Sequence, residues 1–253
     1  MVEARPAHLQ PSPLGQVRMN LHNFDFGSDV NGQISEINLL KEMTEGKYEL
    51  ERRVQSGDIV LDIGANCGTF PFTIQQRNPS KVVCVEPSDK LHIILRKNLA
   101  KMPFDSVVHH YGIGTDKTNV YGNSNNKCKN ISFKDLIKTA NLDYVDFLKI
   151  DCEGGEWSIF TEENYEFLTQ NVGHLSAELH ISNIDNGVEK LIEFKNRYLV
   201  GTSNYRVFEP YIWKDATDNI LSDEWIRAYY DWWNPIEGGS AQLLFYMGKS
   251  CQA

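Results

Sequence analysis

Residues 60–68 read VLDIGANCG, an apolar run that ends in an acid and in two glycines spaced four residues apart. The apolar run is typical of a strand that helices cover on both faces. Gly64 and Gly68 are typical of a turn that approaches a ligand closely, because glycine has no Cβ to collide with it. In an open α/β sheet such a turn lies at the carboxyl end of the first strand, where ligands bind. The stretch therefore predicts a strand, a ligand-binding turn and a helix.

Around this stretch, short β-rich runs alternate with longer helix-like stretches from residue 57 onward, which predicts an α/β fold with a parallel sheet. Strands are expected at 59–62, 81–86, 107–111, 145–151 and 174–181, and helices at 69–78, 90–102, 132–140, 158–171 and 188–198. Two later runs, 205–213 and 242–247, are expected to pair antiparallel at a sheet edge, around an aromatic-rich insertion at about 214–240.

The chain is expected to contain one catalytic domain preceded by a shorter segment. Residues 1–56 are interpreted as an N-terminal tail and helical cap, in which 33–55 forms one or two helices broken near Gly46. This cap would pack on the domain edge or cover the cofactor. Residues 57–253 are interpreted as a single domain, because a chain of 253 residues is compatible with one α/β domain and its additions.

Composition and charge exclude several classes of protein. Lys plus Arg minus Asp plus Glu is 25 − 34 = −9, which disfavours nucleic acid and anionic membranes as partners. No apolar run approaches the roughly 20 residues that span a bilayer. The five cysteines are odd in number and include no Cys-x-x-Cys pair, which indicates a reducing compartment. Residues 1–14 lack the apolar core of a secretory signal, so a cytoplasmic protein is expected.

The spacing of the glycine turn helps to identify the ligand. A dinucleotide fingerprint requires Gly-x-Gly-x-x-Gly, but its middle and sixth positions are Asn66 and Thr69 here. S-adenosylmethionine has an ammonium, a carboxylate and a sulfonium instead of phosphates. Asp62 can pair with the ammonium, while Asn66 and the N–H groups of the turn hold the carboxylate. The alternative for Asp62 is a capping or turn-stabilising role, although it precedes the helix by several residues.

An acid at the end of the second strand completes the predicted cofactor site. Glu86 follows Gly64 by 86 − 64 = 22 residues, close to the spacing of about 20 expected for an acid that accepts ribose hydroxyls. Ser88, Tyr111 and Gly112 are candidates for lining an adenine slot. The complete set of expected cofactor-binding residues is Asp62, Gly64, Ala65, Asn66, Gly68, Thr69, Glu86, Pro87, Ser88, Tyr111, Gly112 and Asp151.

Three blocks together resemble one known family. They are DIGANCG at 62–68, VEP at 85–87 and VDFLKIDCEGGE at 145–156, and the match extends over about 57–180. In these blocks the chain is similar to FkbM-type methyltransferases. The resemblance implies S-adenosylmethionine as cofactor and a Rossmann-like class I methyltransferase fold with a mostly parallel seven-stranded sheet and helices on both faces. It also implies O-methylation of secondary metabolites, polyketides or glycans.

Polar side chains gather where the fourth and fifth strands end. Strand alternation places Asp151 on one face of the fourth strand, with Glu153 just past its end, and Glu178 and His180 on one face of the fifth. Asp151, Glu178 and His180 are the candidate catalytic residues. In one mechanism His180 or Asp151 removes a hydroxyl proton. In another, Asp151, Glu153, Glu178 and His180 hold Mg or Mn. A structural hydrogen-bond network is the third interpretation.

Two further charged residues of this block are expected to have structural roles. The ammonium of Lys149 would neutralise Asp151 or Glu86 from the sheet edge. Glu156 would cap or match the charge at the start of the following helix. Neither residue is assigned to catalysis.

Nine aromatic residues lie between positions 205 and 233, and they favour two roles equally. Flat rings beside hydrogen-bonding groups could receive a small-molecule or glycan acceptor, with Tyr229, Trp232 and Trp233 as the substrate-binding candidates. Aromatic segments also fill cores or form contacts between copies in a homo-oligomer.

Other functions compete with methyl transfer to a hydroxyl. A nicotinamide-dependent oxidoreductase uses the same fold class, and a non-catalytic cofactor-binding subunit would keep the same residues. A methyltransferase acting on nucleic acid or protein is disfavoured by the charge of −9 and by the absence of an Asn-Pro-Pro-Tyr-like motif.

Overall fold

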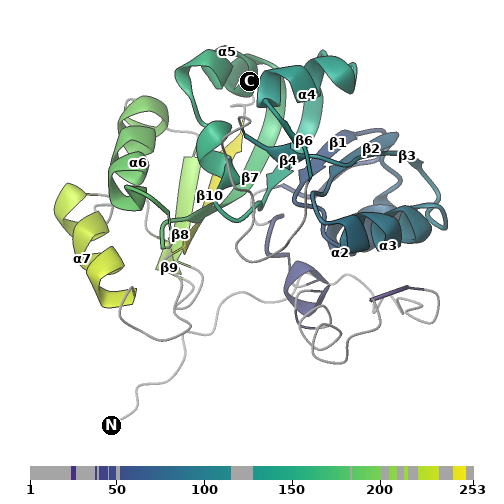
Figure 1. The fold of residues 1–253 in the computed structure, drawn as a ribbon, viewed down its shortest axis with the longest axis horizontal. Helices are drawn as coiled ribbons and strands as arrows, with labels where there is room; N and C mark the ends of the chain where they lie inside the picture. The colour runs from purple at the N-terminus through teal and green to yellow at the C-terminus, as the bar shows by residue number, and fades with distance from the viewer. Residues whose placement is uncertain are drawn as a thin grey trace, which may run out of the picture.

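The computed structural model contains an eight-stranded sheet with the order β3-β2-β1-β6-β7-β10-β8-β9 (Figure 1). The structure describes residues 24–26, 38, 40–44, 46–49, 52–114, 128–182, 184–200, 205–209, 214–215, 222–233 and 242–248. The strands are β1 Ile59–Ile63, β2 Lys81–Val85, β3 Asp105–His109, β6 Val145–Ile150, β7 Val172–His180, β8 Tyr205–Glu209, β9 Lys214–Asp215 and β10 Gln242–Gly248.

Five neighbouring strands of this sheet are parallel, from β3 to β7. The chain leaves β3 and returns beside β1 as β6, so the strand order reverses between β1 and β6. Strand β10 lies antiparallel between β7 and β8, as expected for the late pair. The expected mostly parallel α/β sheet is confirmed. It has one strand more than the seven expected, because the two residues of β9 pair with the end of β8.

Helices cover both faces of the sheet, because alternate strand residues enter different cores. Val60 and Val82 point into a cluster with residues of α2 Thr69–Ile74 and α3 Asp89–Leu99. Leu61 and Val83 point into a larger cluster on the opposite face. The helices that contribute to the larger cluster are α4 Phe133–Thr139, α5 Glu162–Gln170, α6 Gly187–Phe194 and α7 Asp223–Trp233.

Several element boundaries differ from the expected ones. Strand β3 lies at Asp105–His109, two residues earlier than 107–111. The stretch 158–171 is not one helix, because a 3-10 turn, η3 Gly155–Ser158, precedes α5. Two short helical elements follow longer helices: η2 Gln75–Arg77 after α2 and the π-helical η4 Lys195–Leu199 after α6. Strands β4 Gly112–Ile113 and β5 Asn130–Ile131 form a separate two-stranded sheet.

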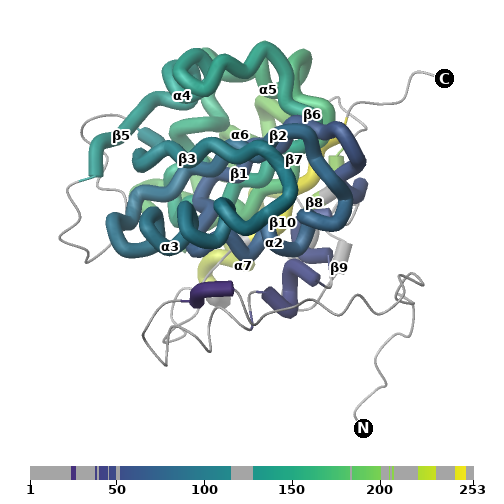
Figure 2. Tube along the Cα trace, turned by 90° about the vertical axis from the view of Figure 1, so that its right-hand side faces the viewer, coloured from purple at the N-terminus to yellow at the C-terminus, as the bar shows by residue number. Residues whose placement is uncertain are grey.

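The described part of the N-terminal segment lies below α2 and α3 in both the ribbon and the tube view (Figure 1, Figure 2). Phe24 and Leu40 form a cluster with Phe72 of α2 and Ile94 of α3. The backbone at 40–44 is helical, and Gly46 then turns the chain with φ of 98°. The division between 1–56 and 57–253 stays a prediction. No helix in the described ranges is long and apolar enough to cross a membrane.

Candidate active site

The turn after β1 passes very close to the end of β6. Gly64 has φ of 77°, and a Cβ added there would lie 1.6 Å from the backbone oxygen of Asp151. The N–H groups of Gly64 and Ala65 both donate to the oxygen of Val85, at 3.0 Å each. Glycine is required at position 64 because any side chain would collide with the neighbouring strand. The turn is thereby fixed at the point where the strand order reverses, which is the usual ligand position of such sheets.

The carboxylate of Glu86 joins the turns that follow β1 and β2. It accepts from the N–H of Asn66 at 2.9 Å and from the N–H of Ser88 at 2.8 Å, one on each oxygen. Burial raises the pKa of Glu86 to about 7, although the backbone donors Ser88 and Asn66 act in the opposite direction. Each carboxylate oxygen keeps a second lone pair, so the group can still accept ribose hydroxyls.

Asp62 at the end of β1 is completely buried and forms an ion pair with Lys149. The distance from Asp62 Oδ1 to Lys149 Nζ is 3.1 Å, and the ammonium also donates to the oxygen of Gly64 at 2.7 Å. Neither carboxylate oxygen of Asp62 completes a hydrogen bond with a described residue. Burial raises the pKa of Asp62, against the effect of Lys149. Oδ2 of Asp62, which Lys149 does not pair with, is the oxygen left for a cationic ligand group.

Tyr48 connects the carboxylates at the ends of β6 and β7. Its hydroxyl lies 2.7 Å from Asp151 Oδ2 and 2.8 Å from Glu178 Oε2, and it donates its single proton to one of them at a time. Lys47 forms an ion pair with Glu178 at 2.9 Å. Burial raises the pKa of Asp151, but the cations Lys149, His180 and Lys47 outweigh it and hold that pKa below its ordinary value. Asp151 is therefore ionised at neutral pH.

His180 is held by a fully buried carboxylate. Glu156 Oε1 accepts from the backbone N–H of His180 at 2.7 Å and lies 3.0 Å from its Nδ1. The other ring nitrogen, Nε2, lies 3.6 Å from Glu153 Oε2. Burial lowers the pKa of His180, but the bond to Glu156 and the charges of Glu156, Asp151 and Glu178 raise it to about 10. The imidazole is therefore protonated at neutral pH.

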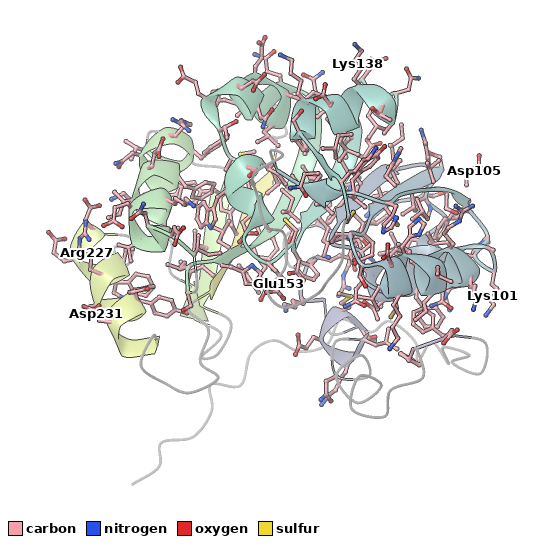
Figure 3. All side chains as sticks on the ribbon, viewed as in Figure 1. Lys101, Asp105, Lys138, Glu153, Arg227 and Asp231 are labelled. Carbon is pink, nitrogen blue, oxygen red and sulfur yellow. The ribbon has the colours of Figure 1, made fainter. Side chains whose placement is uncertain are left out.

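The structure brings three of the four expected metal-ligating residues together. Asp151, Glu153 and His180 each offer a ligand atom, and these atoms lie within 4.8 Å of one another. Glu153 lies at the edge of the sheet that faces the N-terminal segment (Figure 3). Glu178 does not join this group, because Lys47 and Tyr48 bind its carboxylate instead. The expected set of four ligands stays a prediction, and three of its members have ligand atoms within 4.8 Å of one another.

The expected adenine-slot residues lie around the ends of β2 and β3. Tyr111 lines a groove of about 430 Å³ together with His110 and Lys129. His110 Nε2 lies 3.0 Å from the oxygen of Pro87. Gly112 is buried in β4, while the hydroxyl of Ser88 caps α3 by accepting from the N–H of Leu91.

Two other expected cofactor positions follow the turn directly. Gly68 has φ of 94° and forms the N-terminal cap of α2. The buried hydroxyl of Thr69 has no hydrogen-bond partner among the described residues.

The aromatic segment is described only in part. Tyr229 is buried in the larger core and its ring stacks on Trp225, with centroids 4.9 Å apart. The backbones of Trp232 and Trp233 lie in α7, but their side chains lie outside the described part of the structure. Residues 216–221 and 234–240 of the insertion are also outside it. The burial of Tyr229 favours the core role for this residue.

Four residues of the site were missed or given other roles by sequence reasoning. Lys47 and Tyr48 come from the N-terminal segment, and no motif marks them. Lys149 pairs with Asp62 and Asp151, at 3.1 and 3.8 Å, rather than with Glu86. Glu156 accepts from the N–H of Gly154 at 2.9 Å, near the start of η3, but its main partner is His180. The signal available for Glu156 was its place in the block 145–156.

Comparisons with known proteins give similarity only at the level of fold. No family model and no curated protein matches the chain. A SAM-dependent methyltransferase of the DUF858 family from Leishmania major has a TM-score of 0.46 and 12% identity, covering 90% of this chain and 80% of that one. TrmK from M. capricolum, in complex with S-adenosyl-homocysteine, has a TM-score of 0.40 and 11% identity, covering 84% and 68%. The METTL16 MTase domain has a TM-score of 0.41 and 12% identity, covering 88% and 69%.

The strand order itself determines the fold class. Five parallel strands reverse between β1 and β6, and an antiparallel β10 is inserted between β7 and β8. The chain has a Rossmann-like class I methyltransferase fold. The turns after β1 and β2 and the ends of β6 and β7 lie at the same end of this sheet, where ligands bind in open α/β folds.

Proposed function

We propose that the chain is an S-adenosylmethionine-dependent O-methyltransferase of the FkbM type, acting on a hydroxyl of a small-molecule or glycan acceptor. The observation that carries the proposal is the pair of buried acids at the fold's ligand position. Asp62 has unsatisfied oxygens beside the turn, and Glu86 has lone pairs free on both oxygens. An ammonium and a ribose are ligand groups that match these two acids. The net charge of −9 supports an acceptor other than nucleic acid.

The residues of the turn fit the rest of the cofactor. Gly64 and Gly68 leave the backbone accessible, and Asn66, with φ of 52°, lies between them. When bound, the cofactor supplies an electrophilic methyl group on its sulfonium sulfur. Asp62 would bind the ammonium, Glu86 would orient the ribose, and Tyr111 would lie beside the adenine. These residues position the donor, while the residues at the ends of β6 and β7 meet the acceptor.

Two routes for the hydroxyl proton fit the acceptor side. In the first route Asp151 is the better proton acceptor, because the pKa of His180 is about 10 and its imidazole already carries a proton. In the second route Asp151, Glu153 and His180 would hold a divalent cation, which would supply the charge that lowers the pKa of the hydroxyl. In both routes Asp151 orients the hydroxyl toward the methyl group. Tyr48 and Lys47 keep Glu178 beside it.

A thermal-shift measurement tests the cofactor assignment. S-adenosylhomocysteine at about 100 times its Kd is expected to stabilise the chain by about 2.7 kcal/mol, because it binds only the folded state. NAD at the same concentration is expected to leave the melting temperature unchanged. Stabilisation by NAD alone would favour the oxidoreductase. A shift with S-adenosylhomocysteine but no methyl transfer to any hydroxylated acceptor would favour a non-catalytic cofactor-binding subunit.

Cofactor affinity is also expected to depend on pH through Glu86. Ribose hydroxyls donate to the ionised carboxylate, and burial has raised its pKa to about 7 in the ligand-free chain. Lowering the pH through this value adds a proton that binding must displace, so affinity falls as pH falls. The Kd of S-adenosylhomocysteine should rise about tenfold from pH 8 to pH 6. Calorimetry at several pH values measures this, and Glu86→Gln should bind weakly with a flat profile. The same slope in Glu86→Gln would contradict the assignment.

A further inference from the structure

We propose that Asp151, Glu153 and His180 form a binding site for one divalent metal ion, with Mn²⁺ as its representative. Their ligand atoms lie within 4.8 Å of one another. Oxygen and nitrogen ligands lie about 2.0–2.6 Å from such ions, so ligands on opposite sides of one ion are about 4–5 Å apart. The three side chains can therefore reach a common ion without a large rearrangement.

The surroundings of His180 match those of a metal-binding histidine. Its Nδ1 lies 3.0 Å from Glu156 Oε1, which also accepts the backbone N–H of His180. Glu156 is fully buried, and His180 is only 7% exposed. In metal-binding histidines, the ring nitrogen that does not bind the ion usually donates its N–H to a carboxylate in this way. This bond fixes the orientation of the ring. Trp157 Nε1 further fixes this residue by donating to the oxygen of His180 at 2.8 Å.

An ion at Nε2 of His180 would take the place of the proton on that nitrogen, while Nδ1 keeps its bond to Glu156. Nε2 is directed at Glu153 Oε2, 3.6 Å away, and forms no hydrogen bond with any residue in the described ranges. Asp151 is bound by Tyr48 through Oδ2, and its Oδ1 has no partner among the described side chains. Nε2 of His180 and the carboxylates of Asp151 and Glu153 thus lie close enough to bind one ion together.

The neighbouring Glu178 differs from these three residues because its carboxylate is already bound by other side chains. Lys47 and Tyr48 bind the Glu178 carboxylate at 2.9 and 2.8 Å. Glu153 is 53% exposed and its only described ion-pair partner is His180. Mn²⁺ and Mg²⁺ prefer carboxylate ligands to soft thiolate ligands, so two carboxylates and one imidazole suit these ions. The role of the ion, which rests on the proposed function, is to bind the acceptor hydroxyl and lower its pKa.

Titration of the full chain with Mn²⁺ alone tests the site without any acceptor. Electron paramagnetic resonance monitors binding, because the signal of free Mn²⁺ is lost when the ion binds. We expect one ion per chain. Glu153→Gln should raise the Kd for Mn²⁺ about tenfold or more. Because this side chain is half exposed, the fold should be kept. The matched control is Glu178→Gln, which removes a nearby charge but no ligand, and its loss of Mn²⁺ affinity should be smaller than that of Glu153→Gln.

Equal Mn²⁺ affinity in the wild type and Glu153→Gln, or no binding at millimolar Mn²⁺, would overturn the proposal. A larger loss in Glu178→Gln than in Glu153→Gln would also overturn it, since it would place the ion elsewhere. Binding of S-adenosylhomocysteine by the same samples is measured separately. If the cofactor product binds and Mn²⁺ does not, the metal site is wrong and the proposed function stands. If Mn²⁺ binds and the cofactor product does not, the proposed function is wrong.

Discussion

Replacing Lys149 with methionine is expected to lower the free energy of unfolding by about 3–5 kcal/mol, because removing one partner leaves a buried charge without compensation. Lys149 is 1% exposed and Asp62 is completely buried. The ammonium is 3.1 Å from Asp62 and also donates to the oxygen of Gly64. The urea midpoint of Lys149→Met, compared with that of the wild type at an equal m-value, measures the loss.

The matched control is Lys134→Met. Lys134 forms an ion pair with Glu163 at a similar distance, 3.0 Å, but their side chains are 71% and 63% exposed. Its loss should change stability by less than about 0.5 kcal/mol. Adding Asp62→Asn to Lys149→Met should recover part of the stability, because it removes the unpaired charge. If Lys149→Met and Lys134→Met lowered the free energy of unfolding equally, burial would not explain the contribution of the Asp62–Lys149 pair to stability.

Replacing Gly64 with alanine is expected to weaken S-adenosylhomocysteine binding by about a hundredfold, since a misplacement of about 1 Å in a site can have an effect of this size. The added Cβ would lie 1.6 Å from the oxygen of Asp151, so the turn must move away from β6. This movement would displace the N–H groups of the turn, including that of Asn66, which donates to Glu86. Calorimetry measures the Kd, and circular dichroism checks that the variant is folded.

Gly57→Ala separates backbone strain from collision. Gly57 has φ of 89°, similar to the 77° of Gly64, but a Cβ there would meet nothing within 4 Å. Alanine in this conformation costs about 1–2 kcal/mol at either position. Gly57→Ala should therefore lose stability but keep its affinity for S-adenosylhomocysteine. A Kd for Gly64→Ala that equals the Kd for Gly57→Ala would show that close approach to Asp151 is unimportant for binding.

The sequence predicted the centre of the sheet well and its edges less well. Strands β1 and β2 are buried on both faces, so they read as continuous apolar runs. Strand β3 lies at the edge of the sheet, and Asp105 and Val107 are exposed. The sequence pattern therefore does not mark the first residue of this strand. Strand β9 has two residues, and its pairing with β8 depends on contacts that no local pattern encodes.

The turn after β1 and the acid after β2 could be placed from the sequence because these residues keep fixed distances along the chain. The glycine turn and Glu86 are separated by one strand-helix-strand unit. The contacts at the ends of β6 and β7 were predicted only in part, because they join distant segments. Tyr48 binds Asp151 and Glu178 across 103 and 130 residues. Hydrogen bonds between such distant positions arise from the packed fold, and residue spacing alone does not reveal them.

The Tyr48 contact has an evolutionary consequence. One hydroxyl from outside the sheet joins carboxylates from two of its strands. Recombination that exchanged only the sheet between related chains would pair these carboxylates with a foreign partner. Positions 47 and 48 should therefore co-vary with positions 151 and 178 among homologues.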